Sequence, residues 1–410
     1  MKMKKGYVPE LRFPEFQNDV GWGIATVGSK AIKVGSGITP KGGDKNYKKS
    51  GRPFIRSQNI GWGHLILDDV AFIDDDTHST FSSTEIKAND VLLNITGASI
   101  GRSTVADNSI QGGNVNQHVC IIRTKKSELK PYFLNQYLLS SDGQKQIDSF
   151  QAGGNRQGLN FSQIRSFSFL LPSVKEQQKI ADCLSSLDNV ISLQTQKIDV
   201  LQQYKKGLMQ KLFPAEEEMV PELRFSGVSD ITAWNEANLS SICYMKAGKF
   251  ISASEVNTQF SEELYPCYGG NGLRGFTKSF SHSGSFSLIG RQGALCGNVT
   301  FAEGEFYATE HAVVVTTKKK ISNKWLFYCL NYLDLNQYAT GQAQPGLSVN
   351  FLEKIAVNYP VEEKEQKKIA DILSSIDELI AAQTQKLAAL KTHKTGLMQQ
   401  LFPSMDEVNA

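Results

Sequence analysis

Two long stretches of the chain carry apolar residues at alternating steps of four and three positions. The first covers about residues 175–212, and the second ends at Phe402-Pro403. This spacing keeps the apolar side chains on one face of a helix and is typical of a coiled coil. A proline ends each stretch, because proline cannot continue the hydrogen bonds of a helix. The predicted seam contains Ile180, Leu184, Leu187, Ile191, Ile198 and Leu201 in the first helix, and Ile369, Leu373, Ile376, Ile380, Leu387 and Leu390 in the second.

Polar residues interrupt the seam at the same two steps in both helices. They are Gln194 and Lys205 in the first helix and Gln383 and Lys394 in the second. A polar seam residue can fix the register of paired helices, so we expect these helices to pair with each other. Each helix is acidic in its first half and basic in its second. This distribution favours antiparallel pairing, although the helix dipole favours it too. The alternative is two amphipathic helices that pack separately on their own domains.

The segments around the helices occur twice in the sequence. VPELRF stands at residues 8–13 and again at 220–225, and a tryptophan follows each copy at the same step. Two dissimilar stretches, roughly 23–171 and 235–358, lie between the matched segments. A repeated frame around unlike inserts predicts one scaffold that presents two different binding heads. The predicted domains are 1–171 (head 1), 172–214 (first helix), 215–358 (head 2), 359–403 (second helix) and 404–410 (tail).

Both heads mix short strand-like runs with glycine-bounded turns, which predicts a mixed α+β fold. We expect one helix near residues 131–139 and another near 323–332. The predicted fold class is therefore α+β, with two similar heads, each followed by a long helix, and with the helices paired as an antiparallel coiled coil in a pseudo-twofold repeat. Three short motifs correspond between the heads: Gly97-Ala98-x-x-Gly101 with Gly293-Ala294-x-x-Gly297, Gln117-His118 with Glu310-His311, and Gln157-Gly158-Leu159 with Pro345-Gly346-Leu347.

Composition indicates an ordinary globular protein. The chain has 410 residues, 40% hydrophobic and 21% charged, with a net charge of only +3. Nucleic-acid binding would therefore need local clusters of basic residues. The six cysteines form no C-x-x-C pair, so we expect reduced thiols and neither a zinc site nor a disulfide framework. The basic start lacks the apolar segment of a signal peptide, and no apolar run is long enough to span a membrane. These features predict a cytoplasmic protein.

Sequence motifs for catalysis are missing. The chain has no G-x-x-x-x-G-K-[ST] phosphate loop, no H-E-x-x-H zinc motif and no adjacent prolines of the kind found in the N-P-P-[FY] motif of amino-methyltransferases. His118 and His311 stand without a second ligand at metal-binding spacing, so structural or DNA-facing roles are favoured over metal binding. We predict no catalytic residue, no metal site and no cofactor bound by this chain.

The polar and basic loops of the heads are the remaining candidates for function. Arginine can read guanine, asparagine and glutamine can read adenine, and lysine holds phosphates. The alternative is that these loops are simply solvated. The candidate DNA-binding residues are Lys41, Lys45, Lys48, Lys49, Arg56, Ser57, Gln58, Asn59, Arg102, Asn116, Gln117, His118, Arg156 and Gln157 in head 1, and Tyr268, Asn271, Arg274, Arg291, Gln292, Glu310, His311, Gln342 and Gln344 in head 2.

The combined pattern resembles the DNA specificity subunit of type I restriction-modification enzymes. The resemblance rests on the two copies of VPELRF followed by tryptophan, on the helix starts KEQQKIA (175–181) and EQKKIA (365–370), and on the two copies of K-x-G-L-M-Q-x-L-F-P. It covers nearly the whole chain. The start of the first helix departs slightly, because its link to Pro172 is one residue shorter than the link in the second copy.

This resemblance implies two target-recognition domains, each reading one half of an interrupted site in double-stranded DNA, with the helices as the spacer. It implies two modification subunits, which use S-adenosylmethionine to methylate adenine, and two restriction subunits, which use ATP and Mg²⁺. A helix of roughly 55 Å could connect heads in major grooves about 34 Å apart. The rival from another class is a coiled-coil adaptor whose heads bind proteins, and a third possibility is an enzyme that acts on DNA itself.

Overall fold

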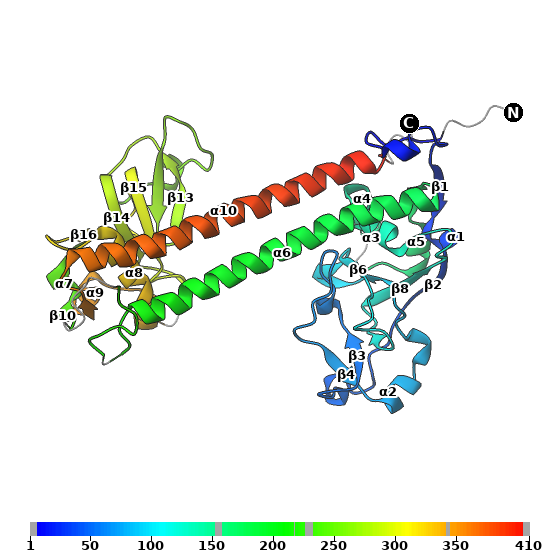
Figure 1. Ribbon diagram of the computed structural model, residues 1–410, viewed down its shortest axis with the longest axis horizontal. Helices are drawn as coiled ribbons and strands as arrows, with labels where there is room; N and C mark the ends of the chain where they lie inside the picture. Colours follow the sequence, from blue (N-terminus) through cyan, green and yellow to red (C-terminus); the bar gives the residue numbers. More distant parts are fainter. Residues whose placement is uncertain (1–5, 152–157, 217, 226–232, 342–344, 405–410) are drawn as a thin grey trace. The chain divides into compact units, whose positions relative to one another are not determined.

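The computed structural model describes residues 6–151, 158–216, 218–225, 233–341 and 345–404 (Figure 1). The chain divides into two compact units, one of Met1–Thr195 with Gln385–Ala410 and the other of Gln196–Thr384. Both boundaries fall inside the long helices α6 (Val174–Leu212) and α10 (Glu363–Leu401). Each unit therefore contains one head, the beginning of one helix and the end of the other. The observed α6 agrees with the predicted helix to within one residue.

Unit 1 contains head 1, which is built on two sheets. The main sheet has the order β2-β8-β5-β6, with antiparallel neighbours, and the second has the order β4-β3-β7, in which β3 and β7 are parallel. A separate antiparallel pair joins β1 to β9. The strands are β1 (Gly23–Thr26), β2 (Ala31–Ser36), β3 (Arg52–Ile55), β4 (Ala71–Ile73), β5 (Val91–Asn94), β6 (Ser103–Val105), β7 (Asn114–Val115), β8 (Val119–Thr124) and β9 (Ser168–Leu171), and the helices are α1 (Val27–Lys30), α2 (Asp75–Ser79), α3 (Pro131–Leu139), α4 (Ser141–Ser149) and α5 (Phe161–Ser166), with 3-10 turns at Pro14–Phe16, Gly43–Asn46, Ser57–Asn59, Ser82–Thr84 and Gly97–Ser99.

Unit 2 contains head 2, whose sheet has the order β11-β16-β14-β15-β12-β13. Its first four strands repeat the order of the main sheet of head 1, and β12 runs parallel to β15 as β3 does to β7. The heads share a fold, as predicted. The strands are β10 (Asn235–Asn238), β11 (Cys243–Ala247), β12 (Tyr265–Gly269), β13 (Gly272–Thr277), β14 (His282–Gly290), β15 (Val299–Ala308), β16 (Ala312–Thr317) and β17 (Ala356–Tyr359), and the helices are α7 (Leu239–Ile242), α8 (Asn323–Tyr332) and α9 (Val349–Leu352), with 3-10 turns at Ala253–Glu255 and Leu335–Tyr338.

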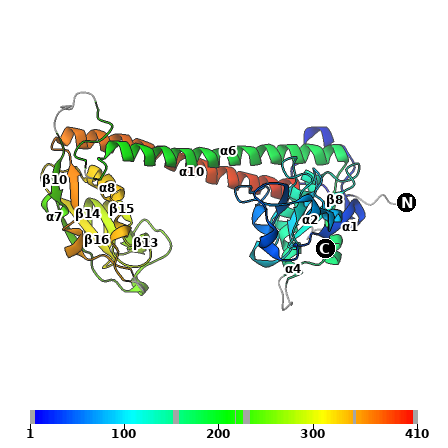
Figure 2. The ribbon, with the colours of Figure 1, turned by 90° about the horizontal axis from the view of Figure 1, so that it is seen from below.

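The core of unit 1 includes the ends of both long helices. Trp22 and Phe133 of head 1 pack with Leu184 from the beginning of α6 and with Leu401 and Phe402 at the end of α10. The rings of Phe133 and Phe402 lie 5.4 Å apart. The helices therefore run antiparallel within this unit, side by side as seen in Figures 1 and 2.

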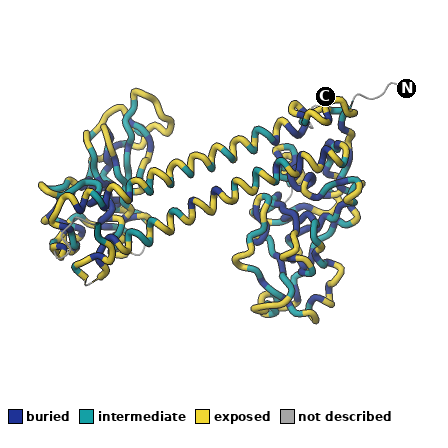
Figure 3. The backbone as a smooth tube through the Cα atoms, viewed as in Figure 1, coloured by how far each residue is buried: buried dark blue, intermediate teal, exposed yellow. Residues whose placement is uncertain are grey.

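Unit 2 is built in the same way with the helices exchanged. Trp234 and Trp325 of head 2 pack with Leu212 and Phe213 at the end of α6 and with Leu373 near the beginning of α10. Figure 3 shows most buried positions in the heads and in the helix turns that pack on them. The predicted antiparallel pairing is confirmed in each unit separately, and the alternative of a helix packed only on its own domain is wrong.

The first VPELRF segment ties both helices to head 1. The guanidinium of Arg12 donates to Glu176 of α6 through Nε at 2.8 Å and Nη2 at 2.9 Å. The side chains of this pair are only 5% and 1% exposed. The backbone N–H of Leu11 donates to the carbonyl of Gln400 at the end of α10, at 3.0 Å. One short segment thus holds the beginning of one helix and the end of the other.

The second VPELRF segment makes the same contacts in unit 2. Arg224 donates to Glu365 of α10 at 3.0 and 2.8 Å, and the N–H of Leu223 donates to the carbonyl of Lys211 of α6 at 2.8 Å. These contacts join the same atoms in both units. The VPELRF sequence is therefore repeated because each copy attaches one head to the two helices.

Gln177 and Gln366 explain a further part of the repeat. Gln177 accepts from the backbone N–H of Lys130 at 2.8 Å and donates to the carbonyl of Pro172 at 3.0 Å. Gln366 accepts from Ser322 at 2.7 Å and donates to the carbonyl of Pro360 in the same way. Both amides are fully buried. They satisfy backbone groups at the starts of α3 and α8, where a helix leaves amide hydrogens without internal partners.

The predicted seam is buried or half-buried at every position, and the lysines in it form ion pairs between the helices. Lys394 of α10 pairs with Asp188 of α6 at 2.5 Å in unit 1, and Lys205 of α6 pairs with Asp377 of α10 at 2.6 Å in unit 2. Acidic first halves therefore meet basic second halves within each unit.

Replacing Arg12 by alanine is expected to destabilise unit 1 by about 3–5 kcal/mol, because Glu176 would stay buried without its partner. Urea denaturation followed by tryptophan fluorescence measures the change. Lys179→Met removes the partly exposed Lys179–Glu15 pair and should change the midpoint little. The double variant Arg12→Met/Glu176→Leu should recover most of the loss, and equal effects of all three variants would contradict the assignment.

Candidate functional site

Both heads bring several loops to one edge of the main sheet. In head 1 these loops follow β2 and β5 and precede β8, and in head 2 they follow β11 and β14 and precede β16. We call this place the loop edge. Most sequence-predicted polar residues that the structure describes lie on these loops, so the loop edge is the candidate site of each head. The others lie after β3 in head 1, or in β12, β13 and the turn between them in head 2.

The turn before β8 has a close counterpart before β16. In head 1, the N–H of Val119 donates to the carbonyl of Asn116 at 3.3 Å, and the N–H of His118 donates to Asn116 Oδ1 at 3.0 Å. In head 2, residues 309–312 make the same two bonds, at 3.0 Å to the carbonyl of Thr309 and at 3.4 Å to its Oγ1. A side-chain oxygen that accepts from the backbone two residues later stabilises such a turn. Gln117 and Glu310 therefore occupy equivalent turn positions.

Backbone bonds between loops also match. The N–H of Ile95 donates to the carbonyl of His118, and the carbonyl of Ile95 accepts from Leu159, at 3.0 and 2.9 Å. In head 2 the N–H of Arg291 donates to the carbonyl of His311 at 3.0 Å, and its carbonyl accepts from residue 347 at 2.9 Å. The correspondence predicted from short motifs is thus confirmed by the hydrogen bonds that hold the loops together.

Glycine is required at equivalent places in the loops after β5 and β14. Gly97 and Gly101 have φ of +73° and +87°, and Gly293 and Gly297 have φ of +88° and +91°. Side chains other than glycine rarely adopt this left-handed backbone. The shared G-A-x-x-G motif therefore encodes a loop shape and not a contact made by its own side chains.

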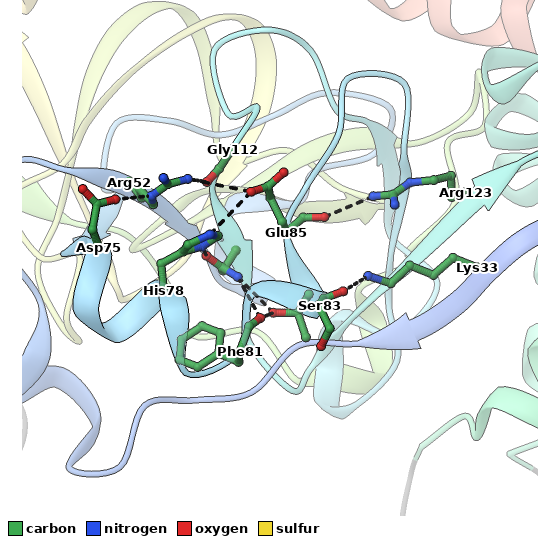
Figure 4. A network of polar contacts seen from close by, with 11 residues as sticks. Lys33, Arg52, Asp75, His78, Phe81, Ser83, Glu85, Gly112 and Arg123 are labelled. Atoms are coloured by element: carbon green, nitrogen blue, oxygen red, sulfur yellow. Dashed lines mark hydrogen bonds and ion pairs between the residues drawn. The ribbon is translucent and has the colours of Figure 1, made fainter.

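The basic run of head 1 extends from Lys41 to Arg56. Some of its residues form internal ion pairs, and others are exposed. Arg52 lies between the carboxylates of Asp75 and Glu85, and His78 reaches the same Glu85 at 3.4 Å (Figure 4). Burial lowers the pKa of nearby Lys33, whose ammonium donates to the carbonyl of Ser83 in the same network. These contacts tie β3 and α2 to the segment before β7, and Lys33 links β2 of the main sheet to the same segment.

The remaining lysines of this run differ in whether they pair with an acidic side chain. Lys41, Lys45 and Lys49 are exposed, whereas Lys48 pairs with Asp74 at 3.4 Å. The loop of the three exposed lysines follows β2 and thus starts from the loop edge. They remain candidates for phosphate contacts.

The segment after β3 is held by Asp69. Arg56 pairs with Asp69 at 3.2 Å and lies over the ring of Tyr47, 5.6 Å from its centroid. Exposed Gln58 donates to the same carboxylate at 2.7 Å, and Ser57 offers its carbonyl to Asn94 at 2.8 Å. This arrangement fixes the direction of the segment toward the loop edge.

Two of the sequence-predicted contact residues are buried. Asn59 is 1% exposed, accepts from the backbone of Arg56, and donates to the carbonyls of Ile66 and Asp69. Asn116 is 7% exposed and holds the turn before β8. Their amides are bonded within the protein itself, so these residues shape the loops and are weaker candidates for DNA contacts.

The hydrogen-bond partners assign different tautomers to the two histidines of the site. Thr39 donates to Gln117 Oε1, so the amide nitrogen of Gln117 faces His118 Nε2 at 3.0 Å, which must accept. The proton of His118 then lies on Nδ1, 2.5 Å from Thr96 Oγ1. In head 2, Glu310 accepts from Nε2 of the neighbouring histidine at 3.2 Å. Equivalent positions therefore present different donors and acceptors.

Head 2 has an open hollow of about 500 Å³ at its loop edge. Asn271, Arg274, Gln292 and His311 line it together with the glycines of the loop after β12. Tyr268 lies apart from this lining and packs on Phe306 at 5.6 Å, and burial raises the pKa of its hydroxyl. The structure thus brings together four of the sequence-predicted residues of head 2.

Several buried polar atoms at the loop edges have no hydrogen-bond partner among the described residues. In head 1 they are Arg56 Nε, Arg102 Nε and Asn94 Oδ1, and in head 2 they are Arg291 Nε and Glu310 Oε2. Such atoms are uncommon in folded proteins and often mark places where water or a ligand binds. Their concentration here supports the loop edge as a binding site.

Four sequence-predicted residues, Arg156, Gln157, Gln342 and Gln344, lie outside the described residues. Sequence reasoning missed Lys246 and Lys249 of head 2, which stand at the end of β11 and in the loop after it. Their position in the sequence could have indicated them. They stand at the end of the first strand of the main sheet and just after it, where head 1 has its basic loop after β2. These two lysines and burial lower the pKa of His282, with burial as the larger cause.

In the part of the chain that the structure describes, no cluster of three or more histidine, cysteine or acidic side chains could hold a metal ion. The helices of that part include none with the length and apolar character to cross a membrane.

Comparison with known proteins identifies relatives of both halves. The family model described as the type I restriction modification DNA specificity domain matches residues 30–203 and 232–392. The specificity subunit of the type I restriction enzyme EcoprrI from Escherichia coli is 49% identical over 142 residues, which cover 34% of this chain and 35% of that protein. The putative type I restriction enzyme MjaX specificity subunit from Methanocaldococcus jannaschii is 24% identical over 90% of both chains.

Solved structures show the same fold. The S subunit of a type I restriction-modification system from M. genitalium matches with a TM-score of 0.66 at 18% identity, over 97% of this chain and all of that one. A chain from a structural study of complex assembly in the type I R-M system matches with a TM-score of 0.54 at 16% identity, over 94% of this chain and 98% of that one.

The loop after β2 begins with a glycine that has no room for a side chain. A Cβ at Gly37 would overlap the carbonyl of Val115, as one at Gly248 would overlap that of Ala308, whereas a Cβ at Gly35 would meet open space. Gly37→Ala is therefore expected to destabilise unit 1 by about 1–3 kcal/mol through overpacking, and Gly35→Ala should have a small effect. Thermal unfolding of both variants measures the difference, and equal stabilities would contradict the close approach.

Proposed function

This chain belongs to the type I restriction-modification DNA specificity family, and we propose that it recognises an interrupted site in double-stranded DNA with one head for each half-site. The observation that carries the proposal is the matched pair of loop edges. Their backbone hydrogen bonds agree, while the side chains that they present differ. Such an arrangement suits two heads that approach the same kind of ligand in the same way and read different sequences.

The chemistry of the loop edges supports DNA as the ligand. Arg274, Asn271 and Gln292 around the hollow of head 2 are the residue types that hydrogen-bond to base edges in the major groove. Exposed lysines stand beside them in both heads, where they can contact phosphates and position the protein.

We propose that α6 and α10 also set the distance between the half-sites. Each helix has 39 residues, a length of roughly 58 Å at 1.5 Å per residue. This exceeds the roughly 34 Å between successive turns of the major groove. Because each head is built onto the beginning of one helix and the end of the other, a change in helix length would be transmitted to both heads.

The proposal includes partner subunits that carry out the chemistry. Two modification subunits would methylate adenine with S-adenosylmethionine, and two restriction subunits would use ATP and Mg²⁺, while this chain binds no cofactor and supplies sequence recognition. Exposed apolar residues of α6, among them Leu193 and Val200 at 64% and 62% exposure, offer a surface on which partner helices could pack.

Selection from a library of random DNA duplexes tests the proposed function. Purified full-length protein should enrich a motif of two fixed parts separated by a spacer of constant length. An adaptor with protein-binding heads would enrich no motif, and an enzyme that acts on DNA without specificity would give none either. Enrichment of one uninterrupted motif would contradict a separate half-site for each head.

Exchange of residues 23–171 for the equivalent span of a relative should change one half of the motif and leave the other half and the spacer unchanged. The reason is that each loop edge is held by bonds within its own unit. The same selection measures the outcome. A chimera in which both halves change would contradict independent heads.

Replacing Lys41, Lys45 and Lys49 by glutamine should weaken binding to all sequences to a similar extent and leave the motif unchanged. Each lost phosphate contact lowers the slope of log K against log salt by roughly 0.9, so the slope should fall by about 2 to 3 units. Titrations at several salt concentrations measure it. Lys126→Gln, beyond the other end of β8, is the control and should keep the original slope.

A further inference from the structure

We infer that Gln117 and Glu310 are the equivalent base-reading positions of the two heads, and that their exchange of an amide for a carboxylate makes the half-sites differ at one base pair. The inference rests on the proposed function of two DNA-reading heads. It goes further by assigning a residue pair, a base for each member and a way to interchange them.

The two residues occupy the same place in three dimensions. Each is the second residue of the turn before the equivalent strand, β8 or β16, and the residue before it holds the turn through its side-chain oxygen. Each side chain also reaches Nε2 of the histidine that follows, at 3.0 Å from Gln117 and 3.2 Å from Glu310. The contacts to the histidine restrict both side chains to the loop edge.

Gln117 retains the hydrogen-bonding groups that adenine requires. An amide has two N–H donors and two acceptor lone pairs on its oxygen. One lone pair accepts from Thr39 and one N–H donates to His118. One donor and one acceptor remain on an exposed side chain, and this combination matches N7 and the N6 amino group of adenine in the major groove.

Glu310 differs because a carboxylate can only accept. Its Oε1 accepts from His311, and its Oε2 is shielded from solvent and has no partner among the described residues. A buried acceptor without a partner gains free energy when a donor reaches it. The side chain as a whole is 31% exposed, so rotation of the carboxylate would bring Oε2 to a ligand at the loop edge. Among major-groove edges, the N4 amino group of cytosine is the donor that glutamate accepts from.

The neighbours of these residues are less suited to set the difference between heads. Asn116 and Thr309 are buried and hold the turns. His118 and His311 are histidines in both heads, so they cannot by themselves distinguish one half-site from the other. The turn position of Gln117 and Glu310 therefore combines a constant backbone with a variable side chain.

The test exchanges the two side chains. Full-length wild-type protein, Glu310→Gln and Gln117→Glu are each used in selection from random DNA duplexes. Glu310→Gln should replace cytosine by adenine at one position of one half-site, and Gln117→Glu should make the reverse change at one position of the other half-site. Affinity for the original sequence should fall roughly tenfold in each case, as for the loss of one good base contact.

Glu353→Gln is the matched control. Glu353 belongs to the same head and changes charge in the same way, but it lies next to the segment before β11, at the opposite end of that strand from the loop edge. This variant should keep the wild-type motif. Thermal unfolding of all variants separates loss of fold from loss of reading, and Gln117→Glu, on an exposed side chain, tests the inference even where Glu310→Gln fails to fold.

The outcomes are distinct. A wild-type protein that enriches no motif overturns the proposed function and the inference together. A wild-type protein with an interrupted motif supports the proposed function, and the inference then fails where both exchange variants keep that motif or where one exchange alters both half-sites. A single altered base pair in a different half-site for each variant supports it.

Discussion

Each head completes its core with side chains from the beginning of one long helix and the end of the other. Trp22 of head 1 lies in one buried cluster with Leu184 of α6 and Leu401 of α10. The antiparallel helices thus contribute to the core of each head and do not only connect the heads. The buried Arg12–Glu176 pair holds the beginning of α6 on head 1, since neither charge could remain buried without the other. A second, equivalent pair holds the beginning of α10 on head 2.

The helices were accessible to sequence reasoning because their signal is local and periodic. The observed α6 begins at Val174 and ends at Leu212, as the heptad spacing and the following Phe213-Pro214 predict. The antiparallel direction was predictable as well, because charge segregation along a helix is visible in the sequence. The role of VPELRF was not predictable, since its partners lie 164 residues away for Arg12 and no periodicity links positions so distant. Repetition marked the segment as important without indicating what it contacts.

Prediction of the candidate site was less complete for a physical reason. Polar residues in a loop can face outward or satisfy the backbone, and composition does not distinguish the two. Asn59 and Asn116 satisfy the backbone, whereas Gln58 and Gln117 beside them are exposed. Arg52 belongs to the same basic run as Lys49, yet Arg52 forms ion pairs with Asp75 and Glu85 of its own head. Only the three-dimensional partners of each side chain separate these cases.

At the loop edge, the backbone determines the shape of the loops, and the exposed side chains determine which groups are presented. Its shape depends on main-chain hydrogen bonds, on glycines with left-handed backbone and on the close approach at Gly37 and Gly248. None of these depends on the identity of the side chain at position 117 or 310. Such a site can change what it presents without a large cost to the fold, because the groups that vary are not the groups that hold the loops. Two heads with one backbone and different exposed residues are the expected result of that separation.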